Sequence, residues 1–321
     1  MSLEEEVRRL KEERDAVFLA HNYQVGEIQD LADFVGDSLY LARKAKESPK
    51  RVILFSGVKF MAETAKILSP EKTVLMPDLA AGCSLADSIT ADELRKWKRA
   101  HPGAMVVSYV NTSAEVKAES DYCCTSSNAM EIVRKIPSEK EILFLPDMFL
   151  GDYIRRETGR KNMHIWVGDC FVHTRMRPET VRRMKVLHPG AELIAHPECG
   201  CSTEVLPEVD RVLSTDGMIK YASQVHSREV LVATEIGILH RIRKINTKTS
   251  FVPLSEEAIC PFMKMNTLEK VRDSLRDMKY EITLSAKVMN KARLSLERMI
   301  EVGGTRTKSL AEGLATVASS E

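Results

Sequence analysis

Short, uninterrupted runs of apolar residues alternate along the chain with segments in which apolar residues recur every three or four positions. The runs, such as VFLA at 17–20 and VILF at 52–55, are rich in Val, Ile, Leu and Phe. Because apolar and polar residues do not alternate within them, they are typical of strands buried on both faces of a parallel sheet. Segments between them, such as SNAMEIVRKI at 127–136, have the spacing of amphipathic helices. This alternation predicts an α/β fold of right-handed βαβ units.

The alternation of strands and helices repeats three times along the chain. Three serines at predicted helix starts, Ser38, Ser126 and Ser214, are each separated by 88 residues. A repeat of this length is too long for a solenoid unit and suits a small α/β domain. The polar residues of each repeat follow its predicted strands, where parallel sheets gather their ligands. We therefore predict three αβα sandwich domains with short parallel sheets, related by a pseudo-threefold axis and sharing an active site at their common interface.

The repeats also suggest domain boundaries. We place the three repeats at 1–84, 85–171 and 172–262. The segment 266–303 has a charged, helical pattern, and we expect its helices to pack on the first repeat. Residues 304–321 are small and polar, and we expect them to form a flexible tail.

Composition and charge argue against several classes of function. Lys and Arg number 47 against 46 Asp and Glu, and a net charge of +1 gives no reason to expect a nucleic acid partner. No apolar stretch approaches the ~20 residues of a membrane span, and the N-terminal segment is charged, without a signal-peptide core. We therefore expect a cytoplasmic protein with reduced thiols, in which seven cysteines favour metal or redox chemistry over disulfides.

Three of these cysteines keep the period of the repeat. Cys83, Cys170 and Cys260 are separated by 87 and 90 residues, and each lies near a Gly, Asp or Pro typical of turns. A single buried cysteine is usually a small packing residue, but one cysteine at the end of each repeat predicts three thiolates around a common centre. Such thiolates bind zinc together with a fourth ligand, or a [4Fe–4S] cluster with one iron left open. An open iron is a Lewis acid that assists the loss of water.

The polar residues that follow the predicted strands are candidate substrate ligands. They are His21, Asn22, Tyr23, Tyr109, Asn111, His196 and Glu198, with hydroxyls at the following helix starts from Ser38, Ser126, Ser214 and Thr215. Such hydroxyls are N-caps, but the N–H groups of a helix start also bind carboxylate or phosphate. Three such sites predict a small polyanionic substrate. His196 beside Glu198 suits general acid–base catalysis.

A set of ten motifs resembles the quinolinate synthase (NadA) family of de novo NAD biosynthesis. The motifs are AHNYQ (20–24), GDS (36–38), SGVKFMAETAKIL (56–68), PDLAAGCSLAD (77–87), SYVNT (108–112), TSSNA (125–129), PD (146–147), HPEC (196–199), STDGM (214–218) and ICPFMKMN (259–266). The resemblance implies three Rossmann-like domains that meet at an oxygen-sensitive [4Fe–4S] cluster. It also implies a transferase that condenses iminoaspartate with dihydroxyacetone phosphate to give quinolinate, phosphate and water.

Carried over by motif, the resemblance implies a role for each candidate residue. Cys83, Cys170 and Cys260 correspond to the cluster ligands, and Tyr23, supported by Glu198 and His196, to the acid–base group near the open iron. The implied substrate contacts are His21 and Ser38 for carboxylates, Tyr109, Asn111 and Ser126 in the second domain, and His196, Ser214 and Thr215 in the third, including phosphate recognition. His173 is expected to touch either substrate or only the surroundings of the cluster. Phe60 and Met61 are expected to line the cavity, with plain core packing an equal alternative.

Four further cysteines have no counterpart in the repeat. We expect Cys123, Cys124, Cys199 and Cys201 to be small packing residues and not cluster ligands. A disulfide between Cys199 and Cys201 is the weaker alternative, because two residues leave little room for a relaxed bridge.

Three rival functions remain on the residues alone. The same site suits an aconitase-like hydro-lyase acting on a small hydroxy acid. A non-catalytic iron–sulfur sensor or electron carrier requires a fourth protein ligand, and no residue in register supplies one. A zinc-stabilised binding protein is the third, distinguished by its metal content. If the family resemblance holds, a transient contact with the enzyme that produces iminoaspartate is a further expectation.

Overall fold

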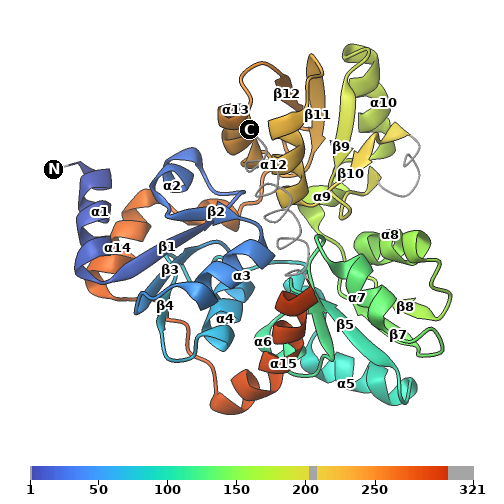
Figure 1. Ribbon diagram of the computed structural model, residues 1–321, viewed down its shortest axis with the longest axis horizontal. Coiled ribbons are helices and arrows are strands. Elements are labelled where there is room, and N and C mark those ends of the chain that lie inside the picture. Colours follow the sequence, from blue (N-terminus) through green and yellow to red (C-terminus); the bar gives the residue numbers. More distant parts are fainter. Residues whose placement is uncertain (1, 202–207, 303–321) are drawn as a thin grey trace, which may run out of the picture.

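The computed structural model describes residues 2–201 and 208–302 (Figure 1). Its strands form three separate four-stranded sheets in which all neighbouring strands are parallel. In sheet order, the first sheet has β2 (Phe34–Gly36), β1 (Ala16–His21), β3 (Val52–Ser56) and β4 (Thr73–Leu75). The second sheet has β6 (Tyr122–Cys124), β5 (Met105–Tyr109), β7 (Ile142–Leu145) and β8 (Met163–Ile165). The third sheet has β10 (Arg211–Val212), β9 (Glu192–Ala195), β11 (Glu229–Ala233) and β12 (Ser250–Pro253). We call the parts of the chain around these sheets the first, second and third units. The predicted α/β class with three αβα units is confirmed.

The sequence repeat is therefore a repeat of topology. In every sheet the second strand of the unit lies beside the first, the third lies on its other side, and the fourth forms the far edge. Because all the strands within a sheet run in one direction, their carboxyl ends lie along one edge. In each unit this edge faces the centre of the molecule (Figure 1).

Helices connect the strands and cover the sheets. The first unit has α2 (Gly26–Leu31), α3 (Ser38–Glu47) and α4 (Lys59–Leu68), preceded by α1 (Leu3–Glu13), and the second has η1 (Ala86–Ser88), α5 (Ala91–Ala100), α6 (Ala114–Lys117), α7 (Ala129–Lys135) and α8 (Met148–Thr158). The third has α9 (Phe171–Thr174), α10 (Pro178–Leu187), α12 (Thr215–Gln224) and α13 (Ile238–Ile245), and the chain continues through η3 (Met263–Met265), α14 (Leu268–Asp277) and α15 (Ala286–Val302).

Strand β1 shows why the run that precedes His21 has no polar positions. All six of its residues are buried. Val17 and Leu19 pack in the large core that also contains residues of α3 and α4, whereas Phe18 and Ala20 pack in a separate core with residues of α1 and α14. Since both faces of the strand contact helices, burial of each side chain stabilises the fold, and polar alternation is not tolerated.

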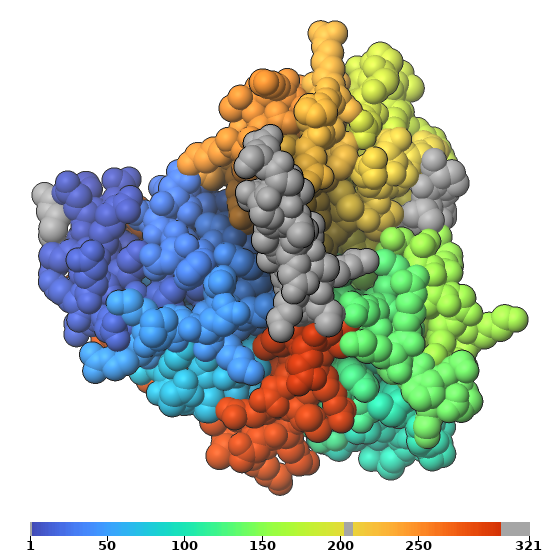
Figure 2. All heavy atoms as spheres, in the orientation of Figure 1, coloured from blue at the N-terminus to red at the C-terminus, as the bar shows by residue number. Residues whose placement is uncertain are grey.

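The two C-terminal helices pack differently. Helix α14 lies against α1 and β3, as the expected packing on the first repeat requires. Helix α15 contacts α4 of the first unit and also β6 and α6 of the second, and it fills the surface between the two (Figure 2). It therefore contacts the first unit and also joins that unit to the second. The expected tail at 304–321 lies outside the described residues.

The described helices include none with the length and apolar character needed to cross a membrane.

Candidate active site

A cavity is lined by residues that follow strands of all three sheets. The carboxyl edges of these sheets face the centre of the molecule (Figure 1). Strand β1 ends at His21, β5 ends at Tyr109, and β9 ends one residue before His196, and all three side chains line the cavity. The cavity takes in about 740 Å³ of space between protein atoms, its mouth included.

The structure brings thirteen of the fifteen predicted site residues to this cavity. They are His21, Tyr23, Ser38, Cys83, Tyr109, Asn111, Ser126, Cys170, His173, His196, Glu198, Thr215 and Cys260. Phe60 and Met61 line the cavity and also belong to the buried core, so lining and core packing are both correct for them. The structure thus shows that the residues converge, and the role of each stays a prediction.

Asn22 and Ser214 are the predicted site residues that do not line the cavity. The side-chain oxygen of Asn22 instead accepts a hydrogen bond from Arg241 at 2.9 Å. Ser214 is the N-cap of α12, and its hydroxyl accepts a hydrogen bond from the backbone N–H of Gly217 at 3.2 Å. The hydroxyl is therefore engaged by its own helix, as is usual for a serine at this position. The next residue, Thr215, is buried and lines the cavity in its place.

The other two helix starts do not use their serines as caps. Ser38 is the first residue of α3, and the cap is Asp37, whose carboxylate accepts a backbone N–H of the helix and the hydroxyl of Ser127 at 2.8 Å. Ser126 lies in the turn before α7, with its hydroxyl 3.2 Å from Nε2 of His196. The repeated serines thus hold equivalent places in the sequence but have different partners.

The three cysteines in register lie in turns that follow the last strand of each unit. Burial, together with the nearby Cys260 thiol, raises the pKa of Cys83 to about 12. Burial also raises the pKa of Cys170, although His173 opposes the shift, and it raises the pKa of Cys260. Three thiols at this position therefore become thiolates only if a positive charge joins them.

A chain of hydrogen bonds crosses the cavity from the first unit to the third. The Tyr23 hydroxyl lies 2.5 Å from Thr234 Oγ1, and Thr234 Oγ1 lies 2.9 Å from Nε2 of His173. The other ring nitrogen of His173, Nδ1, lies 3.1 Å from Glu198 Oε2 and 3.3 Å from Cys170 Sγ. A proton on Tyr23 is therefore linked through two buried side chains to a carboxylate and to a predicted cluster ligand.

Burial and neighbouring charges shift the pKa values of the titratable groups in and around this hydrogen-bond chain, and so set which groups are charged. It lowers the pKa of His21 to about 3 and that of His196 to about 4, which leaves both rings neutral near pH 7. Burial also lowers the pKa of His173, but the adjacent thiol and carboxylate outweigh it and raise the pKa overall. Burial raises the pKa of Glu198, but the neighbouring imidazoles outweigh it and lower the pKa below its usual range. Burial raises the pKa of Tyr23, so the phenol keeps its proton.

Two buried acceptor atoms belong to residues that line the cavity. Glu198 Oε1 and Asn111 Oδ1 have no hydrogen-bond partner among the residues that the structure describes. Because an unpaired buried acceptor is costly, both atoms suit hydrogen-bond donors on a bound ligand.

Glu235 connects the turn that contains the predicted cluster ligand Cys260 with the loop after β1, through Lys264. Its carboxylate accepts the backbone N–H of Cys260 at 3.1 Å and that of Gly237 at 2.7 Å, and it forms a 2.8 Å ion pair with Lys264. Lys264 also donates a hydrogen bond to the backbone carbonyl of Tyr23. Glu235 therefore helps to place both a predicted cluster ligand and the predicted acid–base residue.

Comparison with known proteins identifies the family. A family model described as "Quinolinate synthetase A protein" matches residues 5–301. The chain belongs to the quinolinate synthetase A family.

Curated relatives match over nearly the whole chain. A quinolinate synthase of Thermus thermophilus is 51% identical over 305 residues, which cover 94% of this chain and 98% of the relative. One of Mycobacterium sp. (strain KMS) is 52% identical over 307 residues, covering 93% and 91%. One of Mycobacterium tuberculosis is 51% identical, covering 93% and 88%. The resemblance inferred from the motifs is thus confirmed.

Thr234 and Glu235 of this quinolinate synthetase A family member were not named as candidate site residues from the sequence. They directly follow β11, and so lie at the same carboxyl edge as His21 and Tyr109. The rule that ligands gather beyond strand ends applies to the third strand of a unit as well as the first. Applied to every predicted strand, it could have found both residues.

The cavity also contains one compact set of metal-binding atoms. Cys170 Sγ, His173 and Glu198 present ligand atoms within 4.8 Å of one another. The three cysteines in register do not form such a set, although all three line the cavity. His173 thus both lines the cavity and contacts a predicted cluster ligand, and its contact with substrate stays a prediction.

The cysteines outside the register differ from one another. Cys123 and Cys124 are buried free thiols that do not line the cavity, as expected for packing residues. Cys199 and Cys201 are instead joined by a disulfide, so the expectation of two spare packing residues was wrong for this pair. The turn after β9 folds back and brings their Cα atoms to 5.1 Å, which is within the span of a disulfide.

Proposed function

We propose that this chain is a quinolinate synthase that condenses iminoaspartate with dihydroxyacetone phosphate to quinolinate, phosphate and water. The observation that carries the proposal is that one buried cavity is lined by a thiol from each repeat and by the linked pair Tyr23 and Glu198. Membership of the quinolinate synthetase A family supports the same reaction.

The anionic groups of the substrates match the helix starts at the cavity. Iminoaspartate carries two carboxylates and dihydroxyacetone phosphate carries one phosphate. Ser38 and Thr215 are the first residues of α3 and α12, each ten residues long, and both line the cavity. Because the N-terminus of a helix favours bound anions, we assign a carboxylate to the start of α3 and the phosphate to the start of α12. Ser214 then acts as the cap that orders this second start.

We further propose that Cys83, Cys170 and Cys260 hold a [4Fe–4S] cluster. Three thiols are the donors that such a cluster uses, and the cationic iron would offset the burial that raises their pKa values. The three sulfur atoms do not together form a compact set of the kind that suits a single ion, which favours a larger centre over one zinc. When bound, the cluster supplies an open, Lewis-acidic iron that polarises a substrate oxygen and eases loss of water.

The protein's own groups then move the protons. Tyr23 is a neutral phenol and can give its proton to a departing hydroxyl, and Thr234 can return one from His173. Glu198 is ionised, and its unpaired Oε1 can accept an N–H or O–H of the substrate. The reaction forms a C–C bond and a C=N bond and expels phosphate and water without net oxidation, so acid–base groups and a Lewis acid are sufficient.

The test is an oxygen-free assay of the full chain after reconstitution with iron and sulfide. Quinolinate should form from dihydroxyacetone phosphate and freshly generated iminoaspartate, and omission of either substrate should abolish it. The Cys83→Ala variant should form no product. Absence of quinolinate despite an intact iron–sulfur spectrum would refute the proposed reaction and would favour a hydro-lyase acting on another small hydroxy acid.

A further inference from the structure

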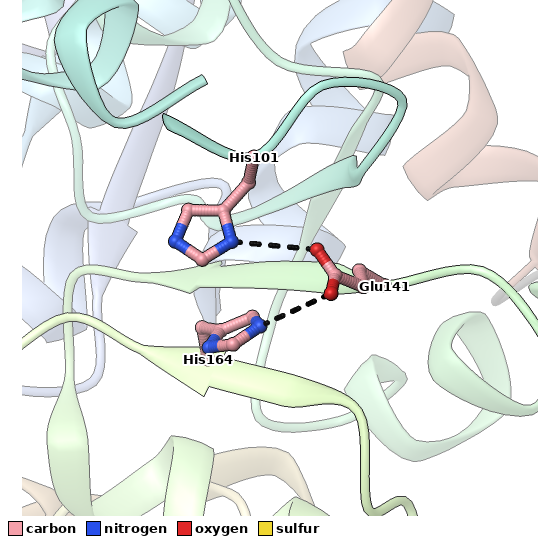
Figure 3. Close-up of side chains that lie close together, drawn as sticks. All are labelled: His101, Glu141 and His164. Atoms are coloured by element: carbon pink, nitrogen blue, oxygen red, sulfur yellow. Dashed lines mark hydrogen bonds and ion pairs between the residues drawn. The ribbon is translucent and has the colours of Figure 1, made fainter. Parts of the chain in front are cut away.

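A second set of metal-binding side chains lies on the surface of the second unit. His101, Glu141 and His164 each present one ligand atom, and these atoms all lie within 4.8 Å of one another (Figure 3). Nδ1 of His101 lies 3.3 Å from Glu141 Oε2, and Nε2 of His164 lies 3.8 Å from Glu141 Oε1. The two rings therefore approach opposite oxygens of one carboxylate.

This set lies at the end of the second sheet opposite the central cavity. Glu141 directly precedes β7, and its backbone carbonyl accepts the N–H of Met105, the first residue of β5, at 2.8 Å. His101 is the C-cap residue of α5, and His164 lies in β8. The set is thus built at the amino ends of β5 and β7, whereas the central cavity lies beyond their carboxyl ends. The two sites are separate.

A row of aromatic rings holds the two imidazoles in place. Trp97 of α5 lies edge-to-face with His101 at 6.3 Å between ring centroids, and it packs against Trp166 at 5.5 Å. The rings of His101 and His164 are 4.3 Å apart. Trp166 is itself fixed, because its indole N–H donates to the carbonyl of Ser88 at 3.0 Å. The imidazoles therefore approach each other before any ion binds, which reduces the ordering that binding requires.

Exposure and charge both suit a dissolved cation. The side chains of His101, His164 and Glu141 are 25%, 41% and 47% exposed, so an ion can reach them. Glu141 forms no ion pair with any Lys or Arg of the described residues. Two imidazole nitrogens and one carboxylate oxygen form a donor set that zinc uses, with water in the remaining position. Imidazole also binds copper and nickel.

We propose that His101, Glu141 and His164 bind one divalent cation of the zinc class. The ion would link the end of α5 to β7 and β8. Because the ligands come together only in the folded chain, bound ion should stabilise the fold. The site takes no part in the proposed quinolinate synthesis, and its test does not depend on that activity.

The test is calorimetric titration of Zn²⁺ into the full chain with its iron–sulfur centre loaded, in parallel with thermal unfolding. We expect one surface site per chain whose affinity falls at least about tenfold in H101A and in H164A, since removal of a ligand should cost no less than removal of its supporting partners. The rise in Tm caused by zinc should shrink in the same variants. Any zinc bound at the central cysteines is common to all variants and cancels in the comparison.

A matched control comes from the third unit. His188 Nδ1 lies 2.9 Å from Glu229 Oε2 with similar exposure, 25% and 29%, but this pair belongs to no set of three ligand atoms among the described residues. H188A should therefore bind zinc as the parent chain does. The proposal is overturned if the parent chain binds no more zinc than the double variant H101A/H164A does. It is also overturned if H188A loses as much zinc affinity as H101A.

Discussion

Two of the contacts between the first and third units have opposite character. At the buried centre, the hydroxyls of Tyr23 and Thr234 lie 2.5 Å apart. At the exposed rim, Asp30 of α2 lies 2.8 Å from Nε2 of His240 on α13 and also pairs with Lys244. The same two units thus form one contact shielded from solvent and one contact in it.

The difference shows how burial turns a contact into chemistry. In the centre, burial raises the pKa of the Tyr23 phenol and lowers the pKa values of His21 and His196, whereas the adjacent thiol and carboxylate raise the pKa of His173. At the rim, water and salt screen the charges, and such pairs contribute little free energy. We therefore expect changes at the centre to reduce activity strongly and changes at the rim to alter stability slightly.

The largest effect should come from a central cysteine. Replacing Cys260 with Ala removes one of three proposed ligands, so the chain should lose its iron and its quinolinate synthesis together. Iron analysis and the oxygen-free assay measure both. Cys124→Ala is the matched control, because Cys124 is a buried free thiol that does not line the cavity. Equal iron content in the two variants would exclude Cys260 as a ligand.

Tyr23→Phe should reduce activity without removing iron. The change deletes the proton of the acid–base group and keeps the ring, and general acid–base groups contribute about 10²- to 10⁴-fold to rate. We expect a loss of kcat in that range with unchanged iron content. Tyr221→Phe serves as control, since the Tyr221 hydroxyl donates to Glu192 outside the cavity. A Tyr23→Phe enzyme with parental kcat would remove Tyr23 from the mechanism.

Thr234→Val should have a smaller effect at the same centre. Valine keeps the shape of threonine but breaks the link between Tyr23 and His173. Because Tyr23 keeps its own proton, we expect kcat to fall about tenfold, at the lower end of the effects of single hydrogen bonds to a reacting group. The pH dependence of kcat should change in the same variant, and Thr234→Ser should restore both. If valine and serine behave alike, the hydroxyl is not a proton link.

The sequence predicted the largely buried first strand of each unit but not the short second strand. The runs at β1, β5 and β9 were evident because both faces of each strand are apolar. β2, β6 and β10 are two or three residues long, and their segments were interpreted only as helix starts. Two or three residues carry no periodicity, so these edge strands depend on pairing with their neighbours in the folded sheet.

The same reasoning explains which site residues were found. Cys83, Cys170 and Cys260 recur with the repeat, and recurrence marks them without any structure. Thr234 does not recur, because the third strand of the first unit is followed by Gly57 and that of the second by Pro146. A residue that one unit supplies alone is not marked by the repeat, and only its place directly after a predicted strand could have indicated it. The repeat therefore locates the centre, and the structure shows the asymmetric groups within it.

The smallest effect should come from the rim. Hydrogen bonds from Lys244 and His240 lower the pKa of Asp30. A lowered pKa means that the stabilising contribution is present above the unfolded value, about 3.9, and is lost as the pH falls through the folded value. Asp30→Asn should therefore reduce the free energy of unfolding by less than about 1 kcal/mol at pH 7, as for other exposed pairs, and the difference should vanish in acid. Denaturant titrations at several pH values measure this, and the kcat of Asp30→Asn should equal that of the parent chain. A large loss of kcat would show that the rim is coupled to the centre and would break the distinction between them.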